Sequence, residues 1–168
     1  MNCAIGDTVV YGGNGVCKVD AIQDIRMGHE RPQKYYVLKT LFVRQTVTVF
    51  VPINNEKLTS KIQPVISKEE ALDLIDHIEP GKGEWIEDRN ERKTRFSEML
   101  SSEDRNEIIS LISIISRHRD ELAKDGKSLN MQDEKYLNDA THRINAELAV
   151  ALDMNIDDIP GFIKEKIG

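Results

Sequence analysis

The residues best suited to a specific chemistry are a single tryptophan and the basic side chains that follow it. Trp85 is the only tryptophan in the chain. Proline and glycines within positions 80–83 break the preceding structure, so the pattern predicts that Trp85 lies in the first turn of a helix. Helical spacing then places Arg89, Arg92 and Lys93 beside the indole. An aromatic plate flanked by cations suits a base step and its phosphate backbone.

The same residues have a plainer interpretation, which the spacing leaves open. Aromatic side chains near helix ends usually pack against a neighbouring helix, and basic residues on an exposed helix face often only keep it solvated. In that case Trp85 belongs to a core, and the chain is a protein-interaction module that binds a partner without touching DNA. The exposure of Trp85 separates the two hypotheses.

Residue types that could support catalysis or metal binding do not form a known constellation. The stretch Gly12 to Lys18 superficially resembles a phosphate loop, but it lacks the required spacing and leads into a predicted strand, so we interpret it as a turn. Asp157 and Asp158 are typical of a helix start. The histidines are scattered without ligand spacing: His29, His77, His118 and His142. We expect a protein that is not an enzyme and has no cofactor, metal or small-molecule substrate.

Size and composition indicate a globular protein. The chain has 168 residues, of which 39% are hydrophobic, enough for one ordinary domain or two small ones. No apolar run approaches the roughly 18 residues of a membrane span, and the N-terminus lacks a basic segment followed by an apolar one. We therefore expect a cytoplasmic protein. Cys3 and Cys17 lack the paired spacing of a zinc or redox site, and we interpret both as reduced structural thiols.

Charge is divided unevenly along the chain. The net charge is -6, and residues 1–66 contain eight Lys or Arg against five Asp or Glu, a net of +3, which leaves -9 for residues 67–168. Because neutralisation of phosphates supplies most nonspecific affinity for nucleic acids, an acidic chain is not expected to coat DNA. The division suggests two modules with different partners and a small DNA-facing surface.

Short alternating segments predict strands in residues 1–66. The expected strands are Gly6–Tyr11, Val16–Gln23, Tyr35–Leu41, Thr46–Val51 and Ile62–Ile66. In the fourth strand, Thr48 and Phe50 share the face that the valines do not occupy. Five short strands in about 66 residues predict a small barrel.

The hydrophobic period changes to that of helices after Ile66. The expected helices begin at Ser67–Glu70, which has a capping-box pattern, at Trp85, after Ser101–Asp104, at Met131 after an Asn130 cap, and at Asp158–Pro160. The third of them is apolar nearly all round, which is typical of a central helix. The sequence therefore predicts an α+β protein in which a β barrel, residues 1–66, precedes an all-helical domain, residues 67–168.

Several motifs together resemble the CarD-like family of bacterial transcription regulators. They are G-D-x-V-V-Y-x-x-x-G-V at Gly6–Val16, the strand Tyr35–Lys39, the strand end Thr48–Pro52, and a helical half introduced by a tryptophan. The resemblance spans nearly the whole chain. The β part is also similar to the polymerase-interacting module of transcription-repair coupling factors, although the chain has no helicase motor.

The resemblance implies a Tudor-like or SH3-like barrel that binds the lobe of the RNA polymerase β subunit. It also implies a helical domain whose tryptophan wedges into the minor groove at the upstream edge of the promoter bubble. The protein is then a monomeric regulator of open-complex stability.

Residues are assigned to these roles by position. The polymerase-binding candidates are Arg26, Arg44, Thr48 and Phe50, and the DNA-binding candidates are Trp85, Arg89, Arg92, Lys93 and Arg95. Family members commonly carry a basic residue at the position of Phe50 and others directly after the tryptophan, where this chain has Glu87 and Asp88. Since carboxylates do not favour phosphate, we expect the chain alone to bind DNA weakly.

Overall fold

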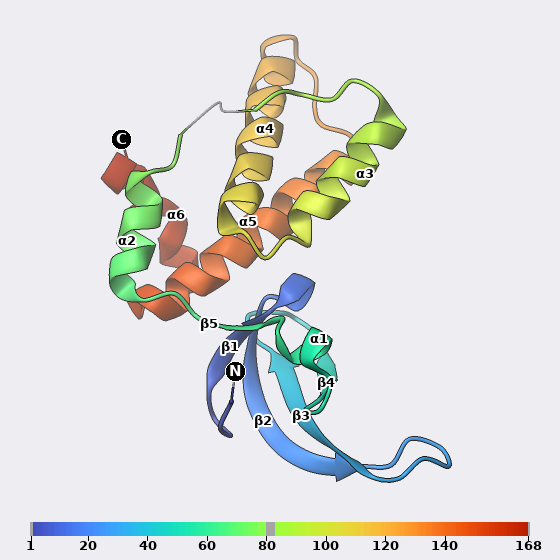
Figure 1. Cartoon of the computed structure of the whole chain (residues 1–168). Helices are drawn as coiled ribbons and strands as arrows, with labels where there is room; N and C mark the ends of the chain where they lie inside the picture. The colour runs from blue at the N-terminus through green and yellow to red at the C-terminus, as the bar shows by residue number, and fades with distance from the viewer. Residues whose placement is uncertain (1, 80–82, 168) are drawn as a thin grey trace. The chain divides into compact units, whose positions relative to one another are not determined.

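The computed structural model describes residues 2–79 and 83–167 and divides into two compact units. The β unit, Met1–Ser67, contains a sheet, and the helical unit, Lys68–Gly168, contains five helices among its described residues (Figure 1). The chain is therefore an α+β protein, and this prediction from the hydrophobic periods is confirmed. No helix within the described residues is long and apolar enough to cross a membrane.

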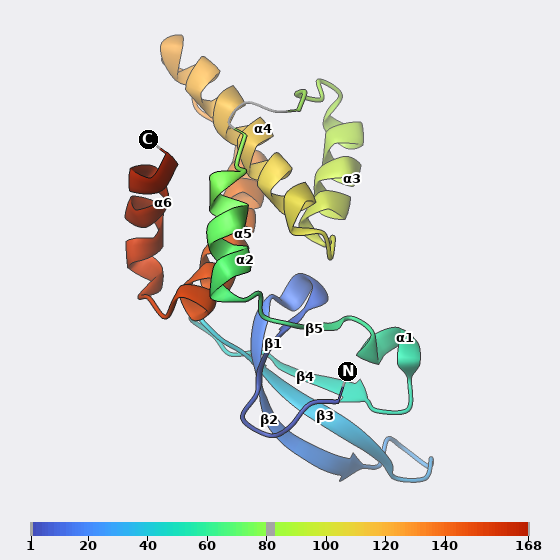
Figure 2. The same ribbon diagram turned by 60° about the vertical axis from the view of Figure 1, so that its left-hand side comes forward.

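Five antiparallel strands form one curved sheet in the β unit (Figure 2). They are β1 Thr8–Tyr11, β2 Val16–Ile25, β3 Gln33–Thr40, β4 Thr48–Pro52 and β5 Ile62–Pro64. Their order in the sheet is β4-β3-β2-β1-β5, so β4 and β5 are the outer strands. A single helical turn, α1 Glu56–Thr59, follows β4 and was not predicted; the Asn55 side chain caps it by accepting a hydrogen bond from the Leu58 amide at 3.1 Å.

The core of the β unit follows the alternation along the strands. Its fully buried members are Val9, Cys17, Val19, Leu38 and Val51, at 0% exposure. Both cysteines are free and buried. Burial raises the pKa of the Cys17 thiol to about 11, because the thiolate would lose its hydration. Cys17 thus behaves as a small apolar core residue.

The glycine-rich stretch after β1 is a tight turn. Gly12–Asn14 forms a short 3-10 helix, η1, and the Tyr11 amide bonds to the Gly15 carbonyl at 2.9 Å. Gly15 has φ +71°, a conformation that favours glycine. The turn leads directly into β2, so the glycines reverse the chain, and the prediction of a turn is confirmed.

Strand β4 has one buried and one exposed face. Val51 is fully buried, whereas Thr48 is exposed and the Phe50 side chain is 46% exposed. In register, Phe50 lies opposite Val37 of β3, and the other edge of β4 ends the sheet. Phe50 is therefore a surface residue, and its substitution does not open the core.

The helical unit is built around α5 Met131–Leu152. The other helices are α2 Lys68–Asp76, α3 Arg89–Leu100, α4 Arg105–Lys124 and α6 Ile159–Ile167, preceded by the 3-10 turn η2 Ile156–Asp158. Each of them packs against α5, and α2 and α6 lie side by side (Figures 1 and 2). The predicted Asn130 cap of α5 is present: its side chain accepts from the Asp133 amide at 2.8 Å.

Apolar side chains from all five helices meet in the core of the helical unit. The largest fully buried ones are Phe96, Ile75, Ile108, Leu111, Ile115, Leu148 and Ile159. Helix α4 contacts both α3 and α5 and buries Ile108, Leu111, Ile114 and Ile115. The central helix is therefore α5, which every other helix of the unit contacts, and the expectation of a central position for α4 is wrong: its apolar run covers only residues 108–115.

Two arginines tie the end of α3 and the start of α4 to α5. Arg105 pairs with Glu147, whose Oε2 accepts from Arg105 Nη2 at 2.7 Å. Arg143 donates to the carbonyl of Leu100 and, at 2.9 Å, to that of Ser102. Carbonyls after a helix end have no partner within the helix, so the guanidinium of Arg143 satisfies groups that burial would otherwise leave unpaired. Burial lowers the pKa of Arg143 from its ordinary value.

We predict that residues 67–168 fold without the β unit, because their core and ion pairs are internal to the helical unit. A fragment of these residues should give a helical circular dichroism spectrum and one cooperative thermal transition. A gradual, non-cooperative loss of helix on heating would show that the two units share stabilising contacts.

Candidate nucleic-acid interface

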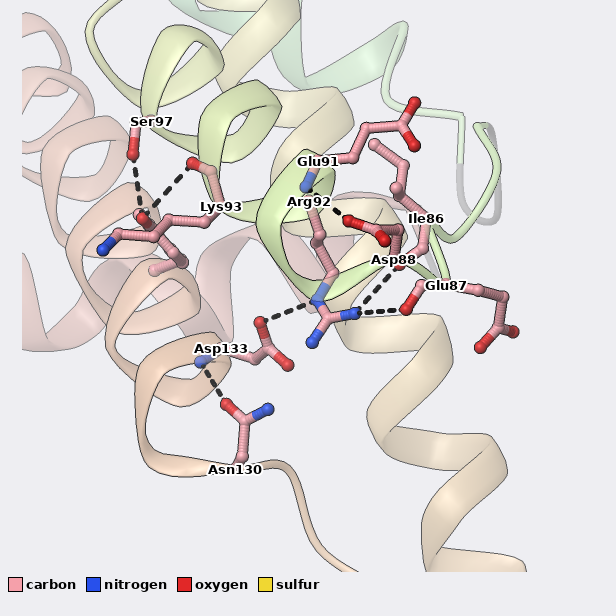
Figure 3. A network of polar contacts seen from close by, with 10 residues as sticks. Ile86, Glu87, Asp88, Glu91, Arg92, Lys93, Ser97, Asn130 and Asp133 are labelled. Atoms are coloured by element: carbon pink, nitrogen blue, oxygen red, sulfur yellow. Dashed lines mark hydrogen bonds and ion pairs between the residues drawn. The ribbon is translucent and has the colours of Figure 1, made fainter.

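Arg92 is the buried centre of the segment that carries Trp85. Its Nε donates to Asp133 Oδ1 of α5 at 3.2 Å, and the two side chains are only 9% and 6% exposed. Its Nη1 donates to the carbonyl oxygens of Ile86 at 3.0 Å and Glu87 at 3.2 Å (Figure 3). One guanidinium therefore fastens residues 86–87 to the start of α5.

Trp85 lies in chain without regular secondary structure before α3. The expectation that it occupies the first turn of a helix is wrong, because Asp88 caps α3: its Oδ1 accepts from the Glu91 amide at 2.9 Å, and the helix begins at Arg89. An Asx cap requires an extended backbone at the cap residue, and Asp88 has φ -67° and ψ 122°. The acidic residue after the tryptophan thus has a structural role.

The indole of Trp85 is half-buried among three side chains. The imidazole of His118, on α4, stacks on it with ring centroids 3.7 Å apart and planes 8° from parallel. Phe96 of α3 meets it edge-on at 5.7 Å and 67°. The Arg92 guanidinium carbon lies 4.7 Å from the ring centroid, a cation-π distance. Trp85 is therefore neither a core residue nor a freely exposed one.

The residues just before Trp85 are held close to α4. Gly83 has φ +96°, and a Cβ built there would come within 2.7 Å of the Ile114 side chain. The Gly83 carbonyl accepts a hydrogen bond from Arg117, also on α4. Only glycine fits this approach without displacing its neighbour, so residues 83–88 are docked on α3 and α4.

The four predicted cations lie in different surroundings. Arg89 and Lys93 are exposed one helical turn apart on α3. Arg95 is exposed but pairs with Glu107 at 3.1 Å and Glu98 at 3.8 Å. Arg92 lies beside the indole, as the spacing predicted, yet it is turned inward and paired. Of the four cations, Arg89, Lys93 and Arg95 are thus exposed, and Arg95 is also ion-paired, whereas Arg92 is buried.

Three residues of this site were not among those selected from the sequence. They are Arg117 and His118 of α4 and Asp133 of α5. The run Arg117-His118-Arg119 brings two positive side chains and an imidazole together after the isoleucine-rich part of α4, and that signal was available. Its contact with Trp85 was not, because the two segments meet only through helix packing.

The polymerase-binding candidates all lie on the surface of the β unit. Arg26, Arg44, Thr48 and Phe50 are exposed. Arg26 follows the β2–β3 ladder at its Ile25–Gln33 end, whereas Arg44 lies in the connection that enters β4 opposite Lys39. The two arginines are therefore at opposite ends of the ladder. Exposed apolar residues adjoin Arg44 and β4: Phe42, Val43 and Val47.

A comparison with protein families identifies the β unit. Residues 4–66 match the family described as CarD-like/TRCF RID domain. The β unit belongs to this family. An RID domain is an RNA-polymerase-interacting, Tudor-like domain without a catalytic role, so the chain binds RNA polymerase. A comparison with curated proteins gives no match.

The family match extends over the β unit alone and leaves the helical unit to be interpreted from its own residues. Within residues 2–79 and 83–167, no group of three or more His, Cys, Asp or Glu could hold a metal ion. The distinguishing feature of the helical unit is the docked segment 83–88 with the aromatic cluster Trp85, Phe96 and His118.

The buried Arg92–Asp133 pair should be essential to the helical unit. Asp133→Ala leaves a guanidinium buried without its carboxylate, and we expect it to lower the free energy of unfolding by about 3–5 kcal/mol. Glu107→Ala is a matched control, since the Arg95–Glu107 pair has a similar N–O distance but is 46% and 35% exposed; it should cost about 1 kcal/mol or less. Urea unfolding followed by circular dichroism measures both. Equal losses would contradict the assignment of Arg92 as the anchor.

Proposed function

We propose that this protein is a transcription regulator that binds the RNA polymerase β subunit and modulates the stability of the promoter open complex. The RID domain supports the polymerase contact, and Trp85 on its docked segment supports a contact with DNA at the upstream edge of the bubble. The observation that carries the second part is an indole that is only half-buried and is followed along the chain by a helix with the exposed cations Arg89 and Lys93.

The polymerase contact is assigned to strand β4. As the last strand of the sheet, β4 presents backbone N–H and C=O groups that a strand of the partner can complete. Thr48 and Phe50 project from the same strand and would supply side-chain selectivity. A 46% exposed phenylalanine on a sheet edge is a typical binding anchor, because aromatic residues carry much of the energy at interfaces.

The DNA contact is assigned to Trp85 together with Arg89, Lys93 and Arg95. Few phosphates can be neutralised by so few cations, so intrinsic DNA affinity is low and the polymerase tether supplies the necessary local concentration. Unstacking a base step costs a few kcal/mol, and the cost is lowest where the duplex has already parted. A tethered indole therefore acts at the bubble edge in the minor groove.

A second candidate function is an interaction module that binds polymerase or another partner without DNA contact. The packing of Trp85 favours it, since His118 stacks on the indole and Phe96 packs against it in a T-shaped arrangement. In that case the aromatic cluster only stabilises the helical unit. The variants below separate the two functions.

Phe50→Asp should weaken binding of the full chain to RNA polymerase by about tenfold or more, because it places a charge on the contact strand. Ile167→Asp is the control: Ile167 is 47% exposed on α6 of the helical unit, so the same change is made at equal exposure away from β4. Binding to core polymerase, and separately to its isolated β lobe, would be measured by biolayer interferometry. Equal affinities for both variants would remove β4 from the interface.

Trp85→Ala should shorten the lifetime of open complexes on a slow-melting promoter by about an order of magnitude, since loss of a base-stacked aromatic costs roughly 1–3 kcal/mol. Trp85→Phe is the matched control, because it keeps an aromatic ring for the cluster and for stacking, and should retain most of the lifetime. Competitor challenge measures the decay, and urea unfolding measures stability. A destabilised helical unit with an unchanged lifetime would favour the second candidate function.

A further inference from the structure

The contact between Trp85 and His118 is not needed to hold the segment 83–88 in place. The imidazole of His118 covers the indole at 3.7 Å with the planes 8° from parallel. Carbon atoms reach optimal van der Waals contact at about 3.5–4.0 Å, so the two rings overlap closely. A flat nitrogen heterocycle stacked on a tryptophan is also the geometry that a nucleobase takes on an aromatic platform. The imidazole therefore occupies an indole face that base stacking would need.

The segment itself is held by other groups. Arg92 bonds to the carbonyls of Ile86 and Glu87, and Arg117 bonds to the carbonyl of Gly83. Gly83 is seated against Ile114. Since these contacts are made by the backbone of the segment, removal of the imidazole would leave the segment in place and uncover one face of the indole.

We propose that His118 competes with DNA for Trp85: its imidazole covers the indole in the free protein and is displaced by a nucleobase when Trp85 engages the bubble edge. The inference rests on the proposed function and adds to it a competition between an internal ring and the DNA for one face of the tryptophan. A ring and a base cannot occupy that face together, so each engagement of DNA breaks the Trp85–His118 stack.

This competition has a defined sign. An aromatic pair contributes enough stability to change an equilibrium by roughly two- to tenfold, and in the free protein this contribution opposes base stacking. His118→Ala should therefore strengthen the Trp85 contact with DNA by roughly two- to tenfold. His118→Phe keeps a flat ring on the indole and should leave the contact near that of the unsubstituted protein.

The free full-length chain tests the geometry. Trp85 is the only tryptophan, so its fluorescence reports on this site alone. His118→Ala should raise the acrylamide quenching constant and shift the emission to longer wavelength, whereas His118→Phe should not increase access of the quencher to the indole. His142→Ala controls for the loss of a histidine, because His142 is exposed on α5. Unchanged quenching in a folded His118→Ala variant would overturn the proposal.

Open-complex lifetime tests the function. His118→Ala should lengthen the lifetime roughly two- to tenfold, and the double variant with Trp85→Ala should decay like Trp85→Ala alone, because the gain depends on the indole. A folded His118→Ala variant with an equal or shorter lifetime overturns the competition, provided that Trp85→Ala shortens the lifetime. If Trp85→Ala itself has no effect, the proposed DNA contact fails, and this inference fails with it.

Discussion

The buried ion pair of Arg92 and Asp133 joins α3 to α5, and Arg92 also holds the segment that carries Trp85. A buried charge is tolerated only when it is paired and its remaining hydrogen-bonding groups are used. Arg92 meets this condition with a carboxylate from α5 and two carbonyls from the segment before α3. The hydrogen bonds of one guanidinium thus fix the position of residues 86–87, which lie outside regular secondary structure. Trp85 is located by that constraint.

Segments without regular secondary structure in this unit are repeatedly fastened by arginine. Arg92 and Arg117 bind carbonyls of residues 83–87, and Arg143 binds those of Leu100 and Ser102 at the α3–α4 connection. A planar guanidinium with several donors can satisfy neighbouring carbonyls that point in one direction, which the single ammonium of lysine does less well. Positive charge in an acidic unit is therefore used partly for internal structure, and counting basic residues overestimates the surface available to DNA.

In the β unit the constraint is a different one, because the outer strands of the sheet have backbone groups without a partner strand on one side. Its edge strand β4 buries Val51 beneath the sheet and directs Phe50 and Thr48 outward. An apolar aromatic on an unprotected edge would invite nonspecific association unless a specific partner covers it. The match of residues 4–66 to an RNA-polymerase-interacting domain agrees with a surface that is retained for a partner.

The sequence by itself determined the division into a β unit and a helical unit and the glycine turn before β2. These features depend on hydrophobic period and local turn chemistry, which act between residues a few positions apart. It also singled out Trp85 and the cation beside it, and the motifs were sufficient to indicate the family of the β unit.

The tertiary structure decided what those residues do. Asp88 begins α3 as a cap, which leaves Trp85 outside the helix; the polar run around it suited a helix equally well by propensity, so sequence could not distinguish the start. Arg92 became an interior anchor because Asp133, 41 residues further along, reaches it from α5. His118 came to cover the indole by the packing of α4. Such contacts arise when separate helices bury their apolar faces together, and no local pattern encodes which polar side chains then meet.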